Sequence, residues 1–266
     1  EVDVRVAFCF PDTYEIGMSN VGMRILYGVM NQMEGVWCQR VFAPWVDMEG
    51  LMRENGIPLF SLESYRPVKE FHGLAFTLQY EMSYSNILNM LDLAGIPLRW
   101  WERSDEDPLI FVGGPCAYNP EPLADFVDVV LLGEGEEMNM EFYQVWAEHL
   151  RAHDGKMNKK ELLDEVVKIP GVYIPRFYDV TYDEAGHVTA VVPNHPDAPE
   201  KLVKRYLQHM DNAYFPENPI VPYLDVIHDR AMLEVQRGCT RGCRFCQAGM
   251  LYRPVREKTV EELQQQ

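Results

Sequence analysis

Short apolar runs alternate with amphipathic stretches along the first 150 residues. Five runs of four to seven residues have the continuous hydrophobicity of buried strands: 4–10, 36–42, 74–78, 109–112 and 127–132. Between them, apolar residues recur at helical spacing over 21–33, 87–94 and 136–152. Strands that alternate with helices predict a parallel sheet covered on both faces. We therefore expect an α/β, Rossmann-like domain over residues 1–152.

Three of the predicted strands are followed by loops with special residues, at 11–20, 113–118 and 133–137. In a doubly wound sheet, ligands bind outside the carboxyl ends of the strands, so these loops should converge at one edge. The candidate cofactor-binding residues there are Gly113, Gly114, Gly133 and Gly135. Taken singly, each loop is better explained as a tight strand-to-helix turn. A ligand crevice and a purely structural edge therefore both stay open.

The pattern changes after residue 152. Residues 153–160 are polar, and the apolar runs 172–180 and 188–192 flank the turn sequence of residues 182–186. Proline-rich sequence without periodicity follows to residue 222. This predicts a connector with a β-hairpin over residues 153–230. A last unit, residues 231–266, should open with a strand over 231–236.

Charge and composition narrow the function classes. The chain has 41 acidic and 24 basic residues, a net charge of −17, which argues against broad nucleic-acid binding. It contains no apolar run of about 18 residues and no signal-peptide pattern at its start. We expect a cytoplasmic protein with no membrane partner. In that compartment its six cysteines should be thiols or metal ligands.

Both ends of the sequence suggest a piece of a longer protein. The chain starts at Glu1 rather than at Met, and its last residues read as the opening turns of a helix. Thr259 and Glu262 form a T-x-x-E capping box for that helix. We expect the 266-residue chain by itself to be an inactive fragment of an enzyme.

Three cysteines lie within eight residues near the end of the chain. Cys239, Cys243 and Cys246 have the spacing C-x3-C-x2-C in a loop that follows the predicted strand. Thiolates suit iron–sulfur clusters and zinc. A closed zinc site needs four ligands, and the nearest other candidate is His228. A cube-type cluster held by three cysteines instead keeps one iron open for catalysis, so we favour the cluster over a zinc knuckle.

The segment 239–246, CTRGCRFC, resembles the signature of the radical S-adenosylmethionine (SAM) superfamily, including the aromatic Phe245 before the last cysteine. The resemblance implies a 4Fe-4S cluster on the three cysteines, with Phe245 in the cofactor-binding set. It further implies SAM bound at the open iron, reductive cleavage to a 5′-deoxyadenosyl radical, and an electron donor such as ferredoxin or flavodoxin. In that family the loop follows the first strand of a partial (β/α) barrel. Residues 231–266 would then be the start of that barrel. The substrate is not indicated.

The segments 12–20 and 113–122 resemble an uncharacterised bacterial branch of radical SAM proteins with an N-terminal cobalamin-binding-like domain. The resemblance adds cobalamin as a candidate second cofactor. No D-x-H-x-x-G sequence occurs, so ligation of cobalamin by a histidine is not expected.

Other residues leave alternatives open. Cys9, Cys38 and Cys116 would fit a second cluster, as in radical SAM methylthiotransferases that modify RNA or protein, but Cys9 and Cys38 are better explained as small buried residues in strands. The carboxylates at 134, 136 and 137 suit either acid–base chemistry or the positive end of a helix dipole, and we favour the dipole. A methylthiotransferase and a non-catalytic metal-binding module remain the alternative functions.

Overall fold

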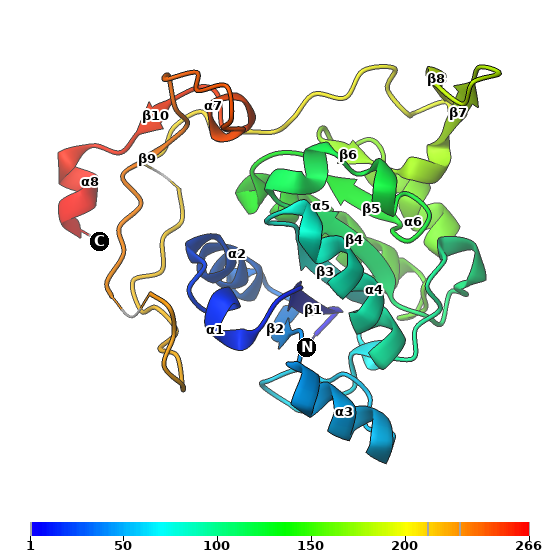
Figure 1. Cartoon of the computed structure of the whole chain (residues 1–266), viewed down its shortest axis with the longest axis horizontal. Coiled ribbons are helices and arrows are strands. Elements are labelled where there is room, and N and C mark those ends of the chain that lie inside the picture. Colours follow the sequence, from blue (N-terminus) through cyan, green and yellow to red (C-terminus); the bar gives the residue numbers. More distant parts are fainter. Residues whose placement is uncertain (1, 212, 229, 266) are drawn as a thin grey trace.

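The computed structural model describes residues 2–211, 213–228 and 230–265. Its centre is a six-stranded sheet with the strand order β2-β1-β3-β4-β5-β6, in which β1 to β5 are parallel and β6 is an antiparallel edge strand (Figure 1). The strands are β1 (Val4–Phe10), β2 (Val36–Phe42), β3 (Gly73–Thr77), β4 (Leu109–Gly113), β5 (Val129–Leu131) and β6 (Val172–Tyr173). The five apolar runs of the sequence are the five parallel strands.

Side chains alternate between the two faces of this sheet, and helices cover both. On β1, Val6 and Phe8 enter one apolar cluster, and Ala7 and Cys9 enter the other. The first cluster includes buried residues of α2 (Val21–Gln32), α5 (Gly135–Ala152) and α6 (Lys159–Val166). The second includes those of α3 (Val46–Asn55) and α4 (Tyr84–Leu93). The predicted Rossmann-like α/β architecture is therefore confirmed.

The expected connector contributes its first elements to this domain. The predicted linker at 153–160 ends where Asn158 caps α6, its side chain accepting a hydrogen bond from the Glu161 N–H (3.2 Å). The apolar run 172–180 does not form one strand. A 3₁₀ turn at Pro175–Phe177 divides it, because proline cannot donate to a strand ladder. Residues 172–173 become β6, and β7 (Tyr178–Tyr182) pairs with β8 (Val188–Pro193) in the predicted hairpin.

The last part of the chain is a strand–loop–helix unit. The strand expected over 231–236 is wrong in extent, since only β9 (Gln236–Arg237) forms, antiparallel to β10 (Arg256–Glu257). A strand needs a hydrogen-bonding neighbour, and among the described residues this segment has only β10. The unit also contains two short helices. The first, α7 (Ala248–Leu251), lies between β9 and β10, and the second, α8 (Val260–Gln265), follows β10. Thr259 Oγ1 accepts from the Glu262 N–H (3.3 Å), the predicted cap.

The strand–loop–helix unit lies on the side of the molecule where α2 and the short helix α1 (Tyr14–Gly17) are found, and the β7–β8 hairpin lies at the opposite side (Figure 1). An irregular segment connects them, passing the edge strand β6, and its Arg205 forms an isolated bridge with Gly133 after β5. Among the residues that the structure describes, no helix has the length and apolar character needed to cross a membrane.

Candidate functional site

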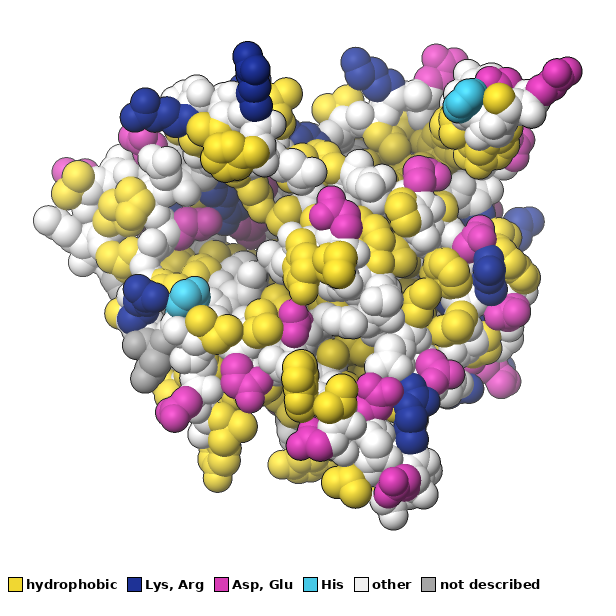
Figure 2. All heavy atoms as spheres, viewed as in Figure 1, with side chains coloured by type: hydrophobic (Ala, Val, Ile, Leu, Met, Phe, Trp, Pro, Cys, Tyr) yellow, Lys and Arg dark blue, Asp and Glu magenta, His cyan; other side chains and the backbone are white. Residues whose placement is uncertain are grey.

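A cavity of about 430 Å³ lies between the sheet domain and the strand–loop–helix unit. Figure 2 shows the corresponding hollow, with basic and acidic side chains in its depth. The sheet domain contributes residues from each of the three loops that follow its strands, and the last unit contributes both ends of the cysteine loop. Its lining includes Asn20, Gly114, Tyr118, Gly133, Glu134, Gly135, Glu136, Arg237, Gly238, Leu251 and Tyr252. The predicted convergence of the three loops is therefore confirmed.

The predicted glycines lie at this edge, and two of them are explained by close backbone approach. Gly114, Gly133 and Gly135 line the cavity, and Gly113 lines a smaller one beside it. Gly114 has φ +99°, and a Cβ there would lie 2.8 Å from the Leu78 carbonyl oxygen. Gly133 has φ +119°, and a Cβ there would lie 2.1 Å from the Arg205 carbonyl oxygen. Their role in binding a cofactor stays a prediction.

Glu134 is the central carboxylate of the cavity. Its two oxygens accept from both terminal nitrogens of Arg256, at 2.6 and 2.7 Å, and one also accepts from the Leu207 N–H at 2.7 Å. Burial would raise the pKa of Glu134, but these hydrogen bonds and the charges of Arg237 and Arg256 lower it below its ordinary value. The group is therefore a carboxylate with both oxygens engaged.

Arg237 lies immediately before Gly238 and Cys239, and its guanidinium is surrounded by acids. It donates to Glu136 (2.5 Å) and to both oxygens of Glu234 (2.8 and 2.9 Å), and it lies 3.4 Å from Glu134. Burial would lower the pKa of Arg237, but the hydrogen bonds of Glu234 and the charge of Glu136 raise it. The acids of the 133–137 loop are thus ion-pair partners, beyond the helix-dipole role that the sequence suggested, and nothing in this geometry favours acid–base chemistry.

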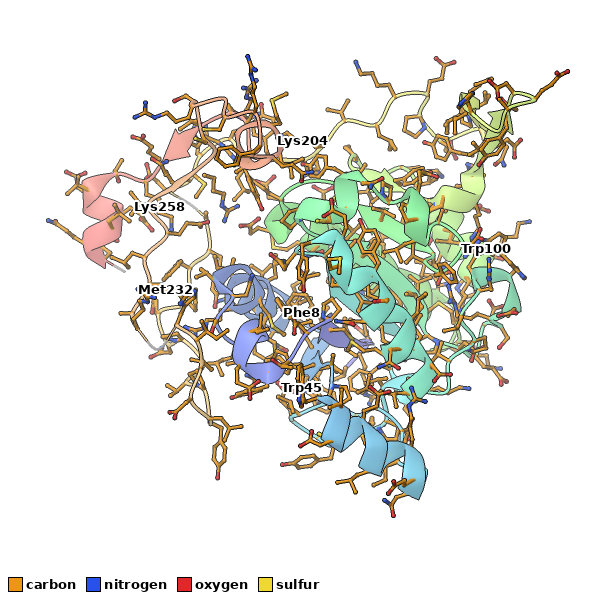
Figure 3. The ribbon with its side chains drawn as sticks, viewed as in Figure 1. Phe8, Trp45, Trp100, Lys204, Met232 and Lys258 are labelled. Carbon is orange, nitrogen blue, oxygen red and sulfur yellow. The ribbon has the colours of Figure 1, made fainter. Side chains whose placement is uncertain are left out.

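Two residues of the irregular segment complete the junction, and the sequence did not indicate them. The backbone of Arg205 is hydrogen-bonded to the residues that follow β5. Its N–H donates to the Leu132 carbonyl (2.9 Å), and its carbonyl accepts from the Glu134 N–H (3.0 Å). Lys204 Nζ donates to the carbonyls of Leu251 (2.6 Å) and Arg253 (2.5 Å). Figure 3 places Lys204 where the last unit meets the sheet domain. The sequence of this segment has no hydrophobic periodicity, so the two adjacent basic residues were its only signal of a possible role in the site.

The cysteine loop is open to solvent. Cys239 is half-buried, whereas Cys243 and Cys246 are exposed and Phe245 is 92% exposed. Gly238 (φ +94°) and Gly242 (φ +66°) turn the backbone, and the Cys246 N–H donates to the Cys243 carbonyl (3.2 Å). Within the described ranges, no three His, Cys, Asp or Glu side chains are grouped so that they could hold a metal ion. Three free thiols on one loop nevertheless match the donor chemistry of a cluster.

The other three cysteines are buried in the sheet domain. Cys9 and Cys38 belong to the apolar clusters on opposite faces of the sheet, and burial raises the pKa of both thiols. Burial also raises the pKa of Cys116 to about 11. Buried thiols with raised pKa values are typical of inert structural cysteines. The structure therefore favours a structural role for these three residues and not ligation of a second iron–sulfur cluster.

The model of one protein family matches residues 22–175, more than half of the chain. This family is described as radical SAM proteins, N-terminal. The chain belongs to this family. The match spans the sheet domain from α2 through β6, including two of the three loops that line the cavity. The expected membership of the radical SAM superfamily is therefore confirmed, although the matched residues end before the cysteine loop.

Two individual proteins are similar to this radical SAM protein. An uncharacterized protein of Methanocaldococcus jannaschii is 24% identical over 263 residues, which cover 97% of this chain and 44% of the relative. The chain thus spans less than half the length of that relative. The radical S-adenosylmethionine methyltransferase TsrM from Kitasatospora setae, solved with tryptophan substrate and a SAM analogue, matches 71% of this chain and 30% of its own. Its sequence identity to this chain is 13% and its TM-score is 0.39.

Proposed function

We propose that this chain carries the cluster-binding loop of an enzyme that cleaves SAM reductively and starts radical chemistry on a substrate still to be identified. Cys239, Cys243 and Cys246 would hold a 4Fe-4S cluster. The observation that carries the proposal is the position of their loop. Its first residues, Arg237 and Gly238, and its return, Leu251 and Tyr252, all lie in the wall of the cavity. A cluster on the loop would therefore lie beside a site that can hold a ligand.

The residues of the loop suit such a cluster. Thiolates are the usual ligands of iron–sulfur clusters, and three of them leave one iron open. Such a cluster, when bound and reduced, supplies the electron that cleaves SAM. A Cβ at position 238 would lie 2.7 Å from the Tyr252 carbonyl oxygen, so glycine is needed where the two ends of the loop approach each other. Cys243 and Cys246 are exposed, so an electron donor such as ferredoxin or flavodoxin could approach a cluster bound to them.

We propose cobalamin as a second cofactor of the same cavity. Two of the three loops, 113–118 and 133–137, offer glycine backbone at the carboxyl edge of the sheet, the position where doubly wound domains bind nucleotide-like ligands. The described residues that line the cavity include no histidine, so a lower ligand from a histidine side chain is not expected. Equilibrium dialysis of the whole chain with hydroxocobalamin tests this. Binding that Gly135→Val abolishes, in a variant that keeps the wild-type circular dichroism spectrum, supports the proposal, and no binding at high micromolar cobalamin contradicts it.

The cluster is tested by its metal content. Anaerobic reconstitution of the chain should give about four irons and four sulfides per chain. Replacing Cys239, Cys243 and Cys246 together by Ala should abolish iron uptake and the brown chromophore. The variant Cys116→Ala, which removes a buried thiol outside the loop, should keep both. Stoichiometric zinc without iron uptake would contradict the proposal and favour a zinc-binding module.

A further inference from the structure

The cysteine loop is closed at its base by a short ladder. The antiparallel strands β9 and β10 pair Arg237 with Arg256 and Gln236 with Glu257. Residues 238–255, which lie between these strands, include all three cysteines of the C-x3-C-x2-C motif. The orientation of this ladder therefore fixes the orientation of the loop that projects from it.

The two arginines of the ladder reach the same pair of acids on the sheet domain. Arg256 makes two hydrogen bonds with Glu134, at 2.6 and 2.7 Å. Arg237 donates to Glu136 at 2.5 Å and lies 3.4 Å from Glu134. Glu134 is the N-cap residue of α5 and Glu136 lies in its first turn, and this helix is anchored in the core of the sheet domain. The loop is thus attached to a rigid part of the fold by a bidentate pair and a second charged contact.

These contacts are shielded from water, so the loss of any one of them should weaken the attachment of the loop. The side chains of Arg237, Arg256, Glu134 and Glu136 are only 7–11% exposed. When one member of a buried ion pair is removed, the remaining charge stays buried without its partner, and the attachment is strongly weakened. Arg256 also donates to the Leu207 carbonyl (2.5 Å), so its guanidinium has a fixed place in the junction.

A second attachment holds the C-terminal part of the loop, close to β10. Lys204 Nζ donates to the carbonyls of Leu251 and Arg253, just before β10. The neighbouring Arg205 is bonded through its backbone to Leu132 and Glu134 at the end of β5. Both ends of the cysteine loop are therefore connected to one turn of the sheet domain. Figure 3 shows Lys204 at this junction, with Lys258 farther out beside α8.

We propose that Glu134 and Glu136 are positioning residues for the cysteine loop. Through Arg256 and Arg237 they hold the base of the loop against the cavity, so that a cluster on the three cysteines faces a ligand in the cavity. That the loop binds an iron–sulfur cluster rests on the proposed function. The attachment itself is a property of the chain without metal, so the two can fail separately.

The attachment is tested by hydrogen–deuterium exchange of the metal-free 266-residue chain. In the variant Glu134→Gln, Glu136→Gln, the amides of Met250, Leu251 and Tyr252, which are hydrogen-bonded in α7, should exchange at least about tenfold faster. Amides of β1 and β3 should keep their rates. The control Glu63→Gln breaks a partly buried ion pair with Arg40 on β2, whose side chains are 15% and 23% exposed, and should leave the loop unchanged. Unchanged loop exchange in the double variant would overturn the proposal.

A mutant cycle separates positioning from general stabilisation. If Glu134 and Arg256 act as one contact, the double variant Glu134→Gln, Arg256→Gln should accelerate loop exchange no more than either single variant. Additive effects would contradict the proposal. In the reconstituted protein, Glu134→Gln should broaden the EPR signal of the reduced cluster, and Glu63→Gln should not. Normal loop exchange in the wild type with no iron uptake would refute the cluster while leaving the attachment intact.

Discussion

The glycine at position 133 is required by two separate features of its surroundings. Its φ of +119° is unfavourable for any other residue, and a Cβ would lie 2.1 Å from the Arg205 carbonyl oxygen. Gly155 has φ +78° with nothing within 4 Å of its virtual Cβ, so it isolates the conformational effect. We expect Gly155→Ala to lower the free energy of unfolding by about 1 kcal/mol and Gly133→Ala to lower it by roughly 3 kcal/mol or more. Urea unfolding measures both, and equal losses would contradict the close approach.

The carboxylate of Glu134 gives the junction a pH dependence. Its pKa is lowered in the folded chain from an ordinary value of 4.5. A carboxyl group whose folded pKa is depressed stabilises the fold above its unfolded pKa, and that stabilisation is lost as the pH falls through the folded value. We therefore expect the protection of the cysteine-loop amides, measured relative to their intrinsic exchange rates at each pH, to fall below about pH 4.5 in the wild type. In Glu134→Gln this protection should be low already at neutral pH, with a weaker dependence on pH between 3 and 6. Parallel pH profiles would contradict this.

At the scale of single residues, the sequence indicated the glycines and cysteines but not their partners. Gly114, Gly133 and Gly135 could be found because glycines after predicted strands are typical of ligand-binding edges. The ion pairs of Glu134 and Glu136 join positions more than 100 residues apart in the chain. Nothing in the local pattern of either segment specifies such a pairing, so it could only be found in the folded structure.

Among the elements, α5 contributes the largest buried side chains. Trp146 is fully buried and packs against Phe111 of β4 and against Phe142 and Tyr143 of its own helix. We expect Trp146→Ala to lower the free energy of unfolding by about 3–5 kcal/mol, because it removes apolar contacts and leaves a cavity. The control Met140→Ala, on the exposed face of the same helix, should change it by less than about 0.5 kcal/mol. Similar losses in the two variants would mean that α5 is not packed as described.

Elements with strong periodicity were predictable, and those without it were not. The strands β1 and β2 begin and end where the apolar runs do, because continuous hydrophobic runs are typical of buried parallel strands. The sequence did not indicate α3, whose Val46 and Leu51 are exposed, because its apolar residues do not form a single buried stripe. The strand expected over 231–236 is short in the structure because its pairing depends on neighbours outside the segment.

At the scale of the whole molecule, the cysteine loop has little protein around it. Cys243, Cys246 and Phe245 are exposed, and the chain spans less than half the length of its curated relative. A radical reaction needs a site from which water is excluded. We expect the 266-residue chain to take up a cluster but to form 5′-deoxyadenosine from SAM, with dithionite as reductant, at least about a hundredfold more slowly than a version with the length of the relative. Equal rates would show that the sheet domain supplies the SAM pocket.

The central claim is that three cysteines hold a cluster with an open iron, and EPR spectroscopy tests it most directly. The reconstituted, dithionite-reduced chain should give the signal of a reduced 4Fe-4S cluster, and addition of SAM should shift its g-values, because SAM can bind only where an iron lacks a protein ligand. The variant with Cys239, Cys243 and Cys246 replaced by Ala should give no signal. A signal in that variant, or a wild-type chain that binds zinc and gives no iron–sulfur signal, would contradict the account.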